Sequence, residues 1–320
     1  MKRWMWIVSI TIMVLLCGAG GVFYYVYSSV KETVDQMYVP IKADKPVSLM
    51  QKKTVTEPPS VKGSTEQNDQ SKTAQEEKFR PFSVLVMGID EREHDRGRSD
   101  TMIVIAVNPN KPSMLMFNIP RDTRTEIVGH HTVDKINHAY AFGGIEMSLA
   151  SVEKFLDMPI DYVVKMNMEG FVKLIDLVGG VEVNNPFAFN QEGTHFDQGT
   201  IKLDGELALL YARMRYEDPR GDLGRNDRQR QVLEQLMDTA MNWGNIDRIP
   251  GMLKALGSNI KTNITFEEMK FMYKNYLPAL QQIDSTEVEG SGTRINHIYY
   301  YLVNDTERKR LHNLLQSTLQ

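Results

Sequence analysis

The segment Val84-Leu-Val-Met-Gly-Ile-Asp90 decides the fold, because it is a short apolar run that ends in a carboxylate. A run of this kind is typical of a strand that is buried on both faces of a sheet. Strand-like runs cover residues 82–89, 101–107, 114–119, 162–166 and 181–183, and helical patterns cover residues 145–156, 168–178, 203–214, 225–241 and 266–277. Shorter strand-like pieces at residues 287–289 and 297–303 precede a terminal helix that ends at Leu319. The interleaving predicts an α/β fold with a mixed central β-sheet flanked by helices.

The N-terminal end of the chain predicts a membrane anchor. Residues 4–27 are predominantly apolar and carry no charge, and a helix of roughly 20 such residues crosses about 30 Å of hydrocarbon. Lys2 and Arg3 precede this run, which predicts a cytoplasmic tail of residues 1–3, a transmembrane helix over residues 4–27 and an extracellular remainder. A cleaved signal peptide is the alternative, and Cys17-Gly-Ala-Gly-Gly21 keeps it open, but the aromatic run that follows favours an uncleaved anchor.

Composition divides the rest of the chain into two parts. Residues 28–78 are polar and contain few aromatic side chains, so we expect an extracellular stalk, with the folded catalytic domain over residues 79–320. Cys17 is the only cysteine, so the outer domain has no disulfide, as fits a bacterial exported protein. The net charge of −4 excludes a globally basic protein that binds nucleic acid, although local basic clusters remain.

Two carboxylates lie at the ends of predicted strands. Asp90 follows the first strand, and Asp100 opens the next one after a short loop. If these strands are antiparallel neighbours, the two side chains lie close together and could hold Mg²⁺ with phosphate oxygens of a substrate. The alternative is that both aspartates cap their own turns. Arg121, which also follows a strand, favours the metal and phosphate interpretation.

A second cluster of cations lies about a hundred residues downstream, in Tyr211-Ala-Arg-Met-Arg215 and Gly224-Arg-Asn-Asp-Arg-Gln-Arg230. Arg213 and Arg215 address one site only if the preceding helix ends near Ala212, because on a continuing helix they would point in different directions. Arg225 and Gln229 are one helical turn apart and share a face. The alternative for Arg225, Arg228 and Arg230 is a solvated helix face, and we expect Arg230 in particular to face solvent.

The histidines have no spacing typical of a zinc site, and no G-x-S-x-G nucleophile motif is present. The methionines of the predicted strands are interpreted as core residues that could also line an irregular lipid-binding wall.

Several segments together resemble the LytR-CpsA-Psr family of cell-envelope proteins, and in particular its Bacillus members that attach teichoic acids. The segments that carry the resemblance are Val84-Leu-Val-Met-Gly-Ile-Asp-Glu-Arg92, Gly97-Arg-Ser-Asp100, Ile119-Pro-Arg-Asp-Thr123, Asp134-Lys-Ile-Asn-His-Ala-Tyr-Ala-Phe-Gly-Gly144, Leu203-Asp-Gly-Glu-Leu-Ala-Leu-Leu-Tyr-Ala-Arg-Met-Arg215 and Gly224-Arg-Asn-Asp-Arg-Gln-Arg-Gln231. So many motifs in one order make a chance resemblance very improbable.

The resemblance implies a Mg²⁺-dependent phosphotransferase, with Mn²⁺ as an alternative ion. Its donor would be an anionic glycopolymer linked to undecaprenyl pyrophosphate, and its acceptor would be a muramic acid hydroxyl of peptidoglycan. Asp90 and Asp100 would bind the metal. The residues that would hold the pyrophosphate are Arg121, Arg213, Arg215, Arg225 and Gln229, with Arg92 and Arg98 as weaker assignments. Asp90, Arg121, Arg215 and Arg225 would be the catalytic residues, and the family's prenyl chain lies in an apolar tunnel between sheet and helices.

Two other functions remain open at this stage. One is a hydrolase that splits prenyl pyrophosphates with water as the acceptor, and the other is a non-enzymatic regulator of wall metabolism. The sequence does not identify a general base, for which Asp90, Asp122 and Asp227 are candidates.

Overall fold

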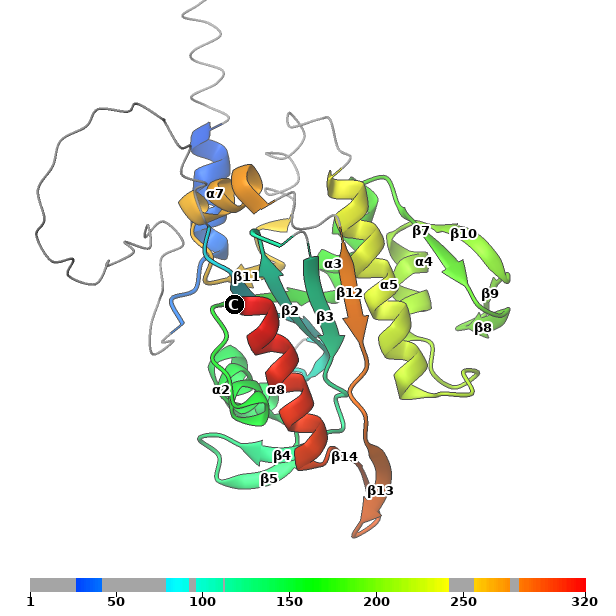
Figure 1. The fold of residues 1–320 in the computed structure, drawn as a ribbon. Helices are drawn as coiled ribbons and strands as arrows, with labels where there is room; N and C mark the ends of the chain where they lie inside the picture. The colour runs from blue at the N-terminus through cyan, green and yellow to red at the C-terminus, as the bar shows by residue number, and fades with distance from the viewer. Residues whose placement is uncertain (1–26, 42–78, 92–95, 112, 242–255, 277–281) are drawn as a thin grey trace, which may run out of the picture.

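The computed structural model describes residues 27–41, 79–91, 96–111, 113–241, 256–276 and 282–320. One twisted central sheet has helices on both faces, and small two-stranded hairpins lie at its margins (Figure 1). This mixed α/β architecture confirms the fold class that the sequence predicts.

The central sheet has six strands in the order β11-β6-β1-β2-β3-β12 within the described part of the chain. β1 is antiparallel to β2 and parallel to β6, so the sheet is mixed. Its strands are β11 (Ile260–Thr262), β6 (Tyr162–Asn167), β1 (Phe82–Ile89), β2 (Ser99–Asn108), β3 (Ser113–Asn118) and β12 (Ile283–Thr286). The smaller sheets pair β4 (Arg124–Ile127) with β5 (Thr132–Lys135), β7 (Val181–Asn185) with β10 (Gly199–Leu203), β8 (Phe189–Gln191) with β9 (Thr194–Phe196), and β13 (Ser291–Ile295) with β14 (Ile298–Leu302).

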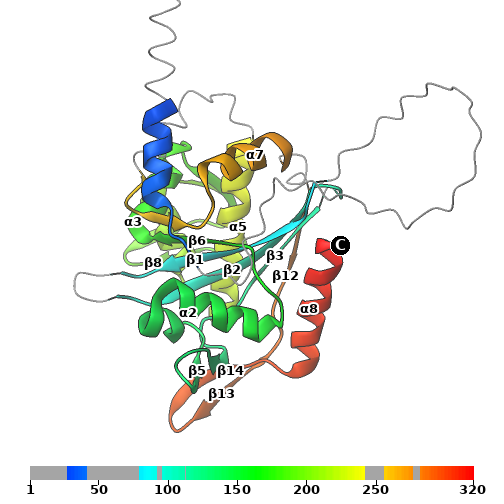
Figure 2. The same ribbon diagram turned by 90° about the vertical axis from the view of Figure 1, so that its left-hand side faces the viewer.

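Alternation along β1 divides the core into two layers. Leu85 and Met87 belong to one buried cluster with residues of α2 (His138–Leu156) and α8 (Asp305–Leu319). Phe82 and Val84 point to the opposite face and pack with residues of α5 (Asp222–Met241) and α7 (Phe266–Tyr276). Successive side chains of a strand point to opposite faces, so one apolar segment supplies both layers. Figure 2 shows α2 and α8 on one side of the sheet, with α5 and α7 on the other.

Two further helices complete the face that carries α5. α3 (Met168–Leu177) begins where the side chain of Asn167 accepts a hydrogen bond from the backbone N–H of Gly170. α4 (Gly205–Arg213) begins where Asp204 accepts from the N–H of Leu207. Both contacts satisfy backbone donors that a helix leaves free at its N-terminus, and they fix where each helix starts.

Two sequence-based boundaries differ from the structure. α2 begins at His138 rather than at residue 145, because a kink with non-helical dihedral angles at Gly143 and Gly144 joins two helical pieces. The strand predicted at residues 287–289 is wrong, since β12 ends at Thr286. Its alternating pattern reflects buried Val288 between two glutamates, and the side chain of Glu287 pairs with Arg220 instead.

The folded unit begins earlier than the expected boundary at residue 79. Residues 27–37 form a helix whose Val30, Val34 and Met37 are buried, and the backbone N–H of Val39 donates to the carbonyl oxygen of Thr262 over 2.8 Å. The apolar residues recur at i, i+4 and i+7 on one face, as in a helix that packs one side against a core. Residues 28–41 are therefore part of the domain and not of a stalk.

The membrane span expected at residues 4–27 lies outside the described residues, apart from Tyr27. Within the part of the chain that the structure describes, no helix combines the length and the apolar character that a membrane crossing requires.

Candidate active site

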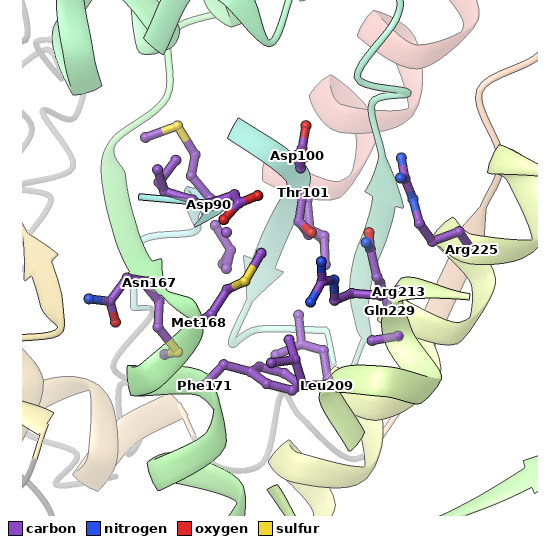
Figure 3. Close-up of a pocket in the computed structure, with 18 of the residues that line it drawn as sticks. Asp90, Asp100, Thr101, Asn167, Met168, Phe171, Leu209, Arg213, Arg225 and Gln229 are labelled. Atoms are coloured by element: carbon purple, nitrogen blue, oxygen red, sulfur yellow. The ribbon is translucent and has the colours of Figure 1, made fainter. Parts of the chain in front are cut away.

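A cavity of about 340 Å³ lies between the sheet and the helices α3, α4 and α5. One end is apolar and the other end is charged, as Figure 3 shows for Phe171 and Leu209 against Asp90 and Asp100. The apolar lining consists of Val86, Ile103, Met166, Met168, Phe171, Leu174, Leu209, Leu233 and Leu236. Such a cavity suits a ligand with an apolar chain and a polar head group.

The two predicted carboxylates meet at the charged end. β1 and β2 are antiparallel, and after a register shift between Gly88 and Ile89 their pairing ends with Ile89 opposite Ser99, next to Asp90 and Asp100. The N–H groups of Asp90 and Asp100 both donate to the carbonyl oxygen of Arg98, over 3.2 and 3.1 Å. Both side chains line the cavity, so the predicted adjacency is confirmed.

The turn between the two aspartates depends on Gly97, whose φ is +76°. A Cβ atom there would lie 2.3 Å from the carbonyl oxygen of Asp90, so a larger residue would disturb the backbone that carries Asp90. Asp100 is itself held in place, because its Oδ1 accepts from Asn137 over 3.2 Å and lies 3.1 Å from a guanidinium nitrogen of Arg121.

Each of the five main head-group residues that the sequence predicts lines the same cavity: Arg121, Arg213, Arg215, Arg225 and Gln229. α4 ends at Arg213, and Met214 follows with an extended ψ of 134°. The chain therefore leaves the helix between the two arginines, and both reach one site, as the early helix end predicts. Arg225 and Gln229 lie one turn apart on α5 and share its cavity face.

Asp222 is a site residue that the sequence analysis missed. Its Oδ1 lies 2.6 Å from Arg225, 3.8 Å from Arg121 and 4.0 Å from Arg215. One carboxylate thus lies among three arginines that come from different segments. The only local signal was its position three residues before Arg225 in the first turn of a helix.

One carboxylate at the centre leaves much of the positive charge uncompensated. Burial lowers the pKa of Arg225, with Arg121 and Arg215 adding to the effect and Asp222 and Asp100 opposing it. For Arg121 the balance is reversed: burial alone would lower the pKa, but Asp100, Asp222 and Asp122 outweigh it and raise the pKa. An anion bound beside Arg225 would therefore be stabilised by a charge that the protein leaves only partly neutralised.

Hydrogen bonding at Arg225 leads to the same conclusion. Among the described residues, Nε of Arg225 has no hydrogen-bond partner, whereas Nη2 forms an ion pair with Asp222 over 2.6 Å. Buried N–H groups without acceptors are costly, so a ligand that supplies acceptors would gain free energy here.

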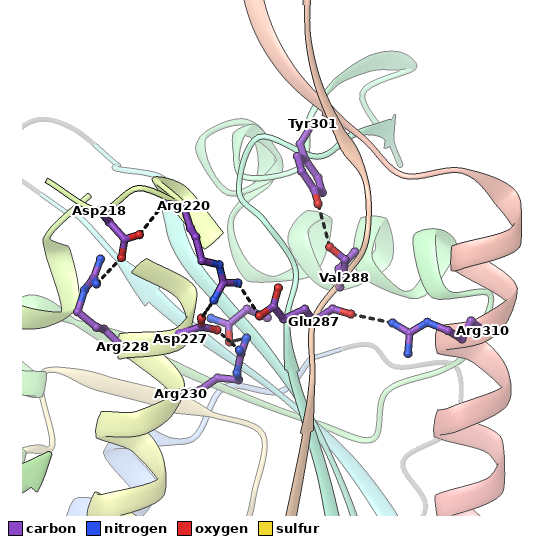
Figure 4. Close-up of polar contacts among 10 residues, drawn as sticks. Asp218, Arg220, Asp227, Arg228, Arg230, Glu287, Val288, Tyr301 and Arg310 are labelled. Atoms are coloured by element: carbon purple, nitrogen blue, oxygen red, sulfur yellow. Dashed lines mark hydrogen bonds and ion pairs between the residues drawn. The ribbon is translucent and has the colours of Figure 1, made fainter. Parts of the chain in front are cut away.

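Arg228 and Arg230 are buried, so the expected solvated face is wrong for them (Figure 4). Arg228 pairs with Asp218 over 2.6 Å and donates to the carbonyl oxygen of Met214 over 2.6 Å, between Arg213 and Arg215. Arg230 pairs with Asp227 and is buried, contrary to the expectation that it faces solvent. The carboxylates that pair with these two arginines lie in the preceding loop and one helical turn away. A run of charges in the sequence does not show that such pairs bury the arginines.

The weaker pyrophosphate residues and the candidate bases differ in whether they line the cavity. Arg92 lies outside the described residues, and Arg98 is exposed and does not line the cavity. Among the three candidate bases, Asp90 lines the cavity, whereas Asp122 pairs with Lys135 over 2.6 Å and Asp227 pairs with Arg220 over 2.5 Å.

The metal assignment depends on two carboxylates alone. No cluster of three or more histidine, cysteine or acidic side chains suited to a metal occurs in the described ranges. Asp90 and Asp100 nevertheless present hard oxygen atoms at the cavity mouth, beside the arginines, and Mg²⁺ commonly binds one or two carboxylates together with substrate phosphates.

The fold and the cavity together define the class: a mixed α/β protein whose cavity suits an amphiphilic ligand with an apolar chain and an anionic, phosphate-like head. The chain belongs to the LytR_cpsA_psr family, whose model matches residues 24–317. The resemblance seen in the sequence motifs is thereby confirmed.

Relatives in the same family carry names that describe a transferase. The polyisoprenyl-teichoic acid–peptidoglycan teichoic acid transferase TagU of Bacillus subtilis (strain 168) is 41% identical over 324 residues, which cover 100% of this chain and 97% of that protein. The protein of the same name from Halalkalibacterium halodurans is 44% identical over 313 residues, which cover 97% of this chain and 95% of that protein.

Solved structures show the same fold. The crystal structure of B. subtilis TagU is 43% identical with a TM-score of 0.62, over 75% of this chain and 97% of that chain. A structure of TagT bound to LI-WTA is 30% identical with a TM-score of 0.64, over 75% of this chain and 91% of that chain.

Proposed function

We propose that this chain is a transferase that moves a teichoic-acid-type anionic polymer from undecaprenyl pyrophosphate to a muramic acid hydroxyl of peptidoglycan. The observation that carries the proposal is a cavity with apolar walls that ends in four arginines and two aspartates. The relatives named as polyisoprenyl-teichoic acid–peptidoglycan teichoic acid transferases support the choice of donor and acceptor.

The two ends of the cavity have different tasks in binding the donor. The prenyl chain would lie against apolar side chains such as Met166, Phe171 and Leu236, where burial stabilises it by about 0.8 kcal/mol for each CH₂ group. The pyrophosphate would then lie at the arginine end, where planar guanidinium groups can hold phosphate oxygens through paired hydrogen bonds.

The reaction is a phosphoryl transfer, in which the protein mainly positions the donor and the acceptor and neutralises the charge of the phosphates. The acceptor hydroxyl oxygen bonds to the phosphorus that carries the polymer, and the bond from that phosphorus to the bridging oxygen breaks. Prenyl phosphate leaves with the bonding electrons, and the hydroxyl proton passes to a base. Arg121, Arg215 and Arg225 would stabilise the charge that develops on the leaving phosphate.

We further propose that Asp90 and Asp100 hold a divalent cation, Mg²⁺ or in its place Mn²⁺. Their oxygen ligands and their position beside the arginines fit such an ion, with phosphate oxygens completing its coordination. A bound cation would neutralise phosphate oxygens and favour ionisation of the acceptor hydroxyl.

The location that we propose for this activity is the outer face of the cell membrane. Residues 4–27 would anchor the chain as a single span, with the N-terminus in the cytoplasm and the catalytic domain outside.

The test is a transfer assay with the full-length chain, a labelled polymer on a prenyl-pyrophosphate carrier and a soluble peptidoglycan oligomer. We expect label on the oligomer with wild type, none with Arg121→Ala, and wild-type transfer with the exposed control Arg124→Ala. Release of labelled polymer phosphate at the same rate with and without oligomer would instead identify a hydrolase. No turnover of the donor at all would contradict an enzymatic function.

A further inference from the structure

Two tyrosines expose aromatic surface around the charged end of the cavity. Tyr216 is 86% exposed, and its ring centre lies 4.6 Å from the guanidinium carbon of Arg215, which lines the cavity with it. Tyr299 is 41% exposed and lies on the hairpin formed by β13 and β14. Tyrosine usually has its ring packed against other groups, so an exposed pair beside a substrate pocket indicates a binding role.

The backbone brings Tyr299 to the arginine cluster. β14 runs alongside the segment after β3, since Thr123 and Tyr301 form a parallel bridge and the N–H of Tyr301 donates to the carbonyl oxygen of Asp122 over 2.9 Å. Tyr299 lies two residues before Tyr301 on this strand. Burial raises the pKa of Tyr299, Asp122 and Asp222 add to that effect, and Arg215 opposes it, as expected for a phenol within the field of the cluster.

A glycine on the neighbouring strand makes room for the Tyr299 ring. A Cβ atom at Gly292 would lie 2.6 Å from the phenol oxygen of Tyr299. The ring therefore lies across β13, and its remaining surface stays accessible.

Ion pairs and hydrogen bonds connect the loop after Tyr216 with the segment that leads to the hairpin of β13 and β14 (Figure 4). In the loop that follows Tyr216, Arg220 pairs with Glu287 over 2.5 Å, and Glu287 immediately precedes the hairpin region. The carbonyl oxygen of Glu287 accepts from Arg310 over 2.7 Å, and that of Val288 accepts from the Tyr301 hydroxyl over 3.0 Å. The loop and the hairpin are thus held against each other.

We propose that Tyr216 and Tyr299 form a binding subsite for a pyranose ring of the acceptor glycan. This inference rests on the proposed function. The C–H face of a sugar packs well on an exposed aromatic ring, whose hydroxyl can also hydrogen-bond. The donor's prenyl chain occupies the apolar end, and the acceptor must approach the phosphorus from the side opposite the leaving phosphate. Tyr299 does not line the cavity, so it lies where an acceptor and not the prenyl chain would be bound.

The test measures KM for the soluble peptidoglycan oligomer and for the lipid-linked donor in separate titrations of the full-length chain. Tyr299→Ala and Tyr216→Ala should each raise the acceptor KM about fivefold or more, because stacking with the acceptor is lost. Tyr299→Ala should also leave the donor KM unchanged, because Tyr299 does not line the donor cavity. Tyr299→Phe should restore the wild-type acceptor KM, since the ring face is kept. Tyr273→Ala on α7 is the matched control, because Tyr273 is 45% exposed at a distance from the hairpin.

An unchanged acceptor KM in both alanine variants would overturn the proposal, as would a rise in the donor KM alone, which would assign the tyrosines to the donor's sugar. Direct calorimetric titration of the oligomer separates this inference from the proposed function. Weaker oligomer binding by Tyr299→Ala would support the subsite even if the wild-type chain transferred no polymer. Equal binding by wild type and Tyr299→Ala would refute the subsite even if transfer were confirmed.

Discussion

Replacing Arg225 with lysine tests whether its buried guanidinium binds the pyrophosphate. The Arg225 side chain is 8% exposed, its Nη2 pairs with Asp222, and its Nε has no hydrogen-bond partner among the described residues. The planar guanidinium can therefore donate to a phosphate oxygen while it keeps its ion pair, whereas the lysine ammonium keeps the charge but presents a single point donor. The loss of one charge-assisted hydrogen bond costs about 1.5 to 3 kcal/mol. At about 1.4 kcal/mol for each factor of ten, transfer should fall roughly tenfold to a hundredfold.

The assay compares initial rates of transfer by the full-length wild type and Arg225→Lys at saturating acceptor, with Arg124→Lys as the exposed control on β4. Thermal melting of each variant shows whether the buried substitution also affects folding. A rate within about twofold of wild type for Arg225→Lys, well below the expected loss, would refute the assignment. An equal loss in Arg124→Lys would show that the effect is not specific to the cavity.

Three further predictions follow from the metal site, the topology and a buried carboxylate. Asp90→Ala and Asp100→Ala should each abolish the response of transfer to added Mg²⁺ while the chain stays folded by circular dichroism, and a normal Mg²⁺ titration in either variant would remove that residue from the metal site. Protease added to intact protoplasts should digest the domain after residue 30, and protection until lysis would contradict the proposed orientation. Burial favours the neutral form of Glu307, but hydrogen bonds from Arg310 and from the N–H of Glu289 outweigh it and lower its pKa. The ionised Glu307 carboxylate stabilises the fold fully above about pH 4.5, and this stabilisation is lost as the pH falls through the folded-state pKa. Glu307→Gln should therefore lower the melting temperature clearly at about pH 7 and little at about pH 3. An equal decrease at both pH values would contradict this prediction.

Much of the fold can be predicted from local pattern. The strand predicted at residues 82–89 has the observed bounds of β1, and the predicted helices α3, α4 and α7 each lie within two residues of their observed ends. The short strands β4, β5 and β8 to β13 were not predicted, because strands of three to five residues contain too few alternations to stand out from loops.

The candidate site was predictable where its residues end an element. Asp90, Asp100 and Arg121 follow or open apolar strands, and Arg213 closes a helix, so their positions relative to the backbone were readable from the sequence. Asp222 was not, because its function depends on contacts with Arg121 and Arg215, which come from two other segments.

The sequence by itself determined the longer strands and helices, the two-layer core of β1 and the set of phosphate-binding residue types, because side-chain periodicity and motif spacing are local properties of the chain. Only the tertiary structure decided that Arg230 is buried, that residues 27–41 pack on the domain and that the strand carrying Tyr299 bridges to Thr123. Burial and ion pairing depend on which distant segments the sheet order brings together, and a buried charge is tolerated only where such a segment supplies its partner.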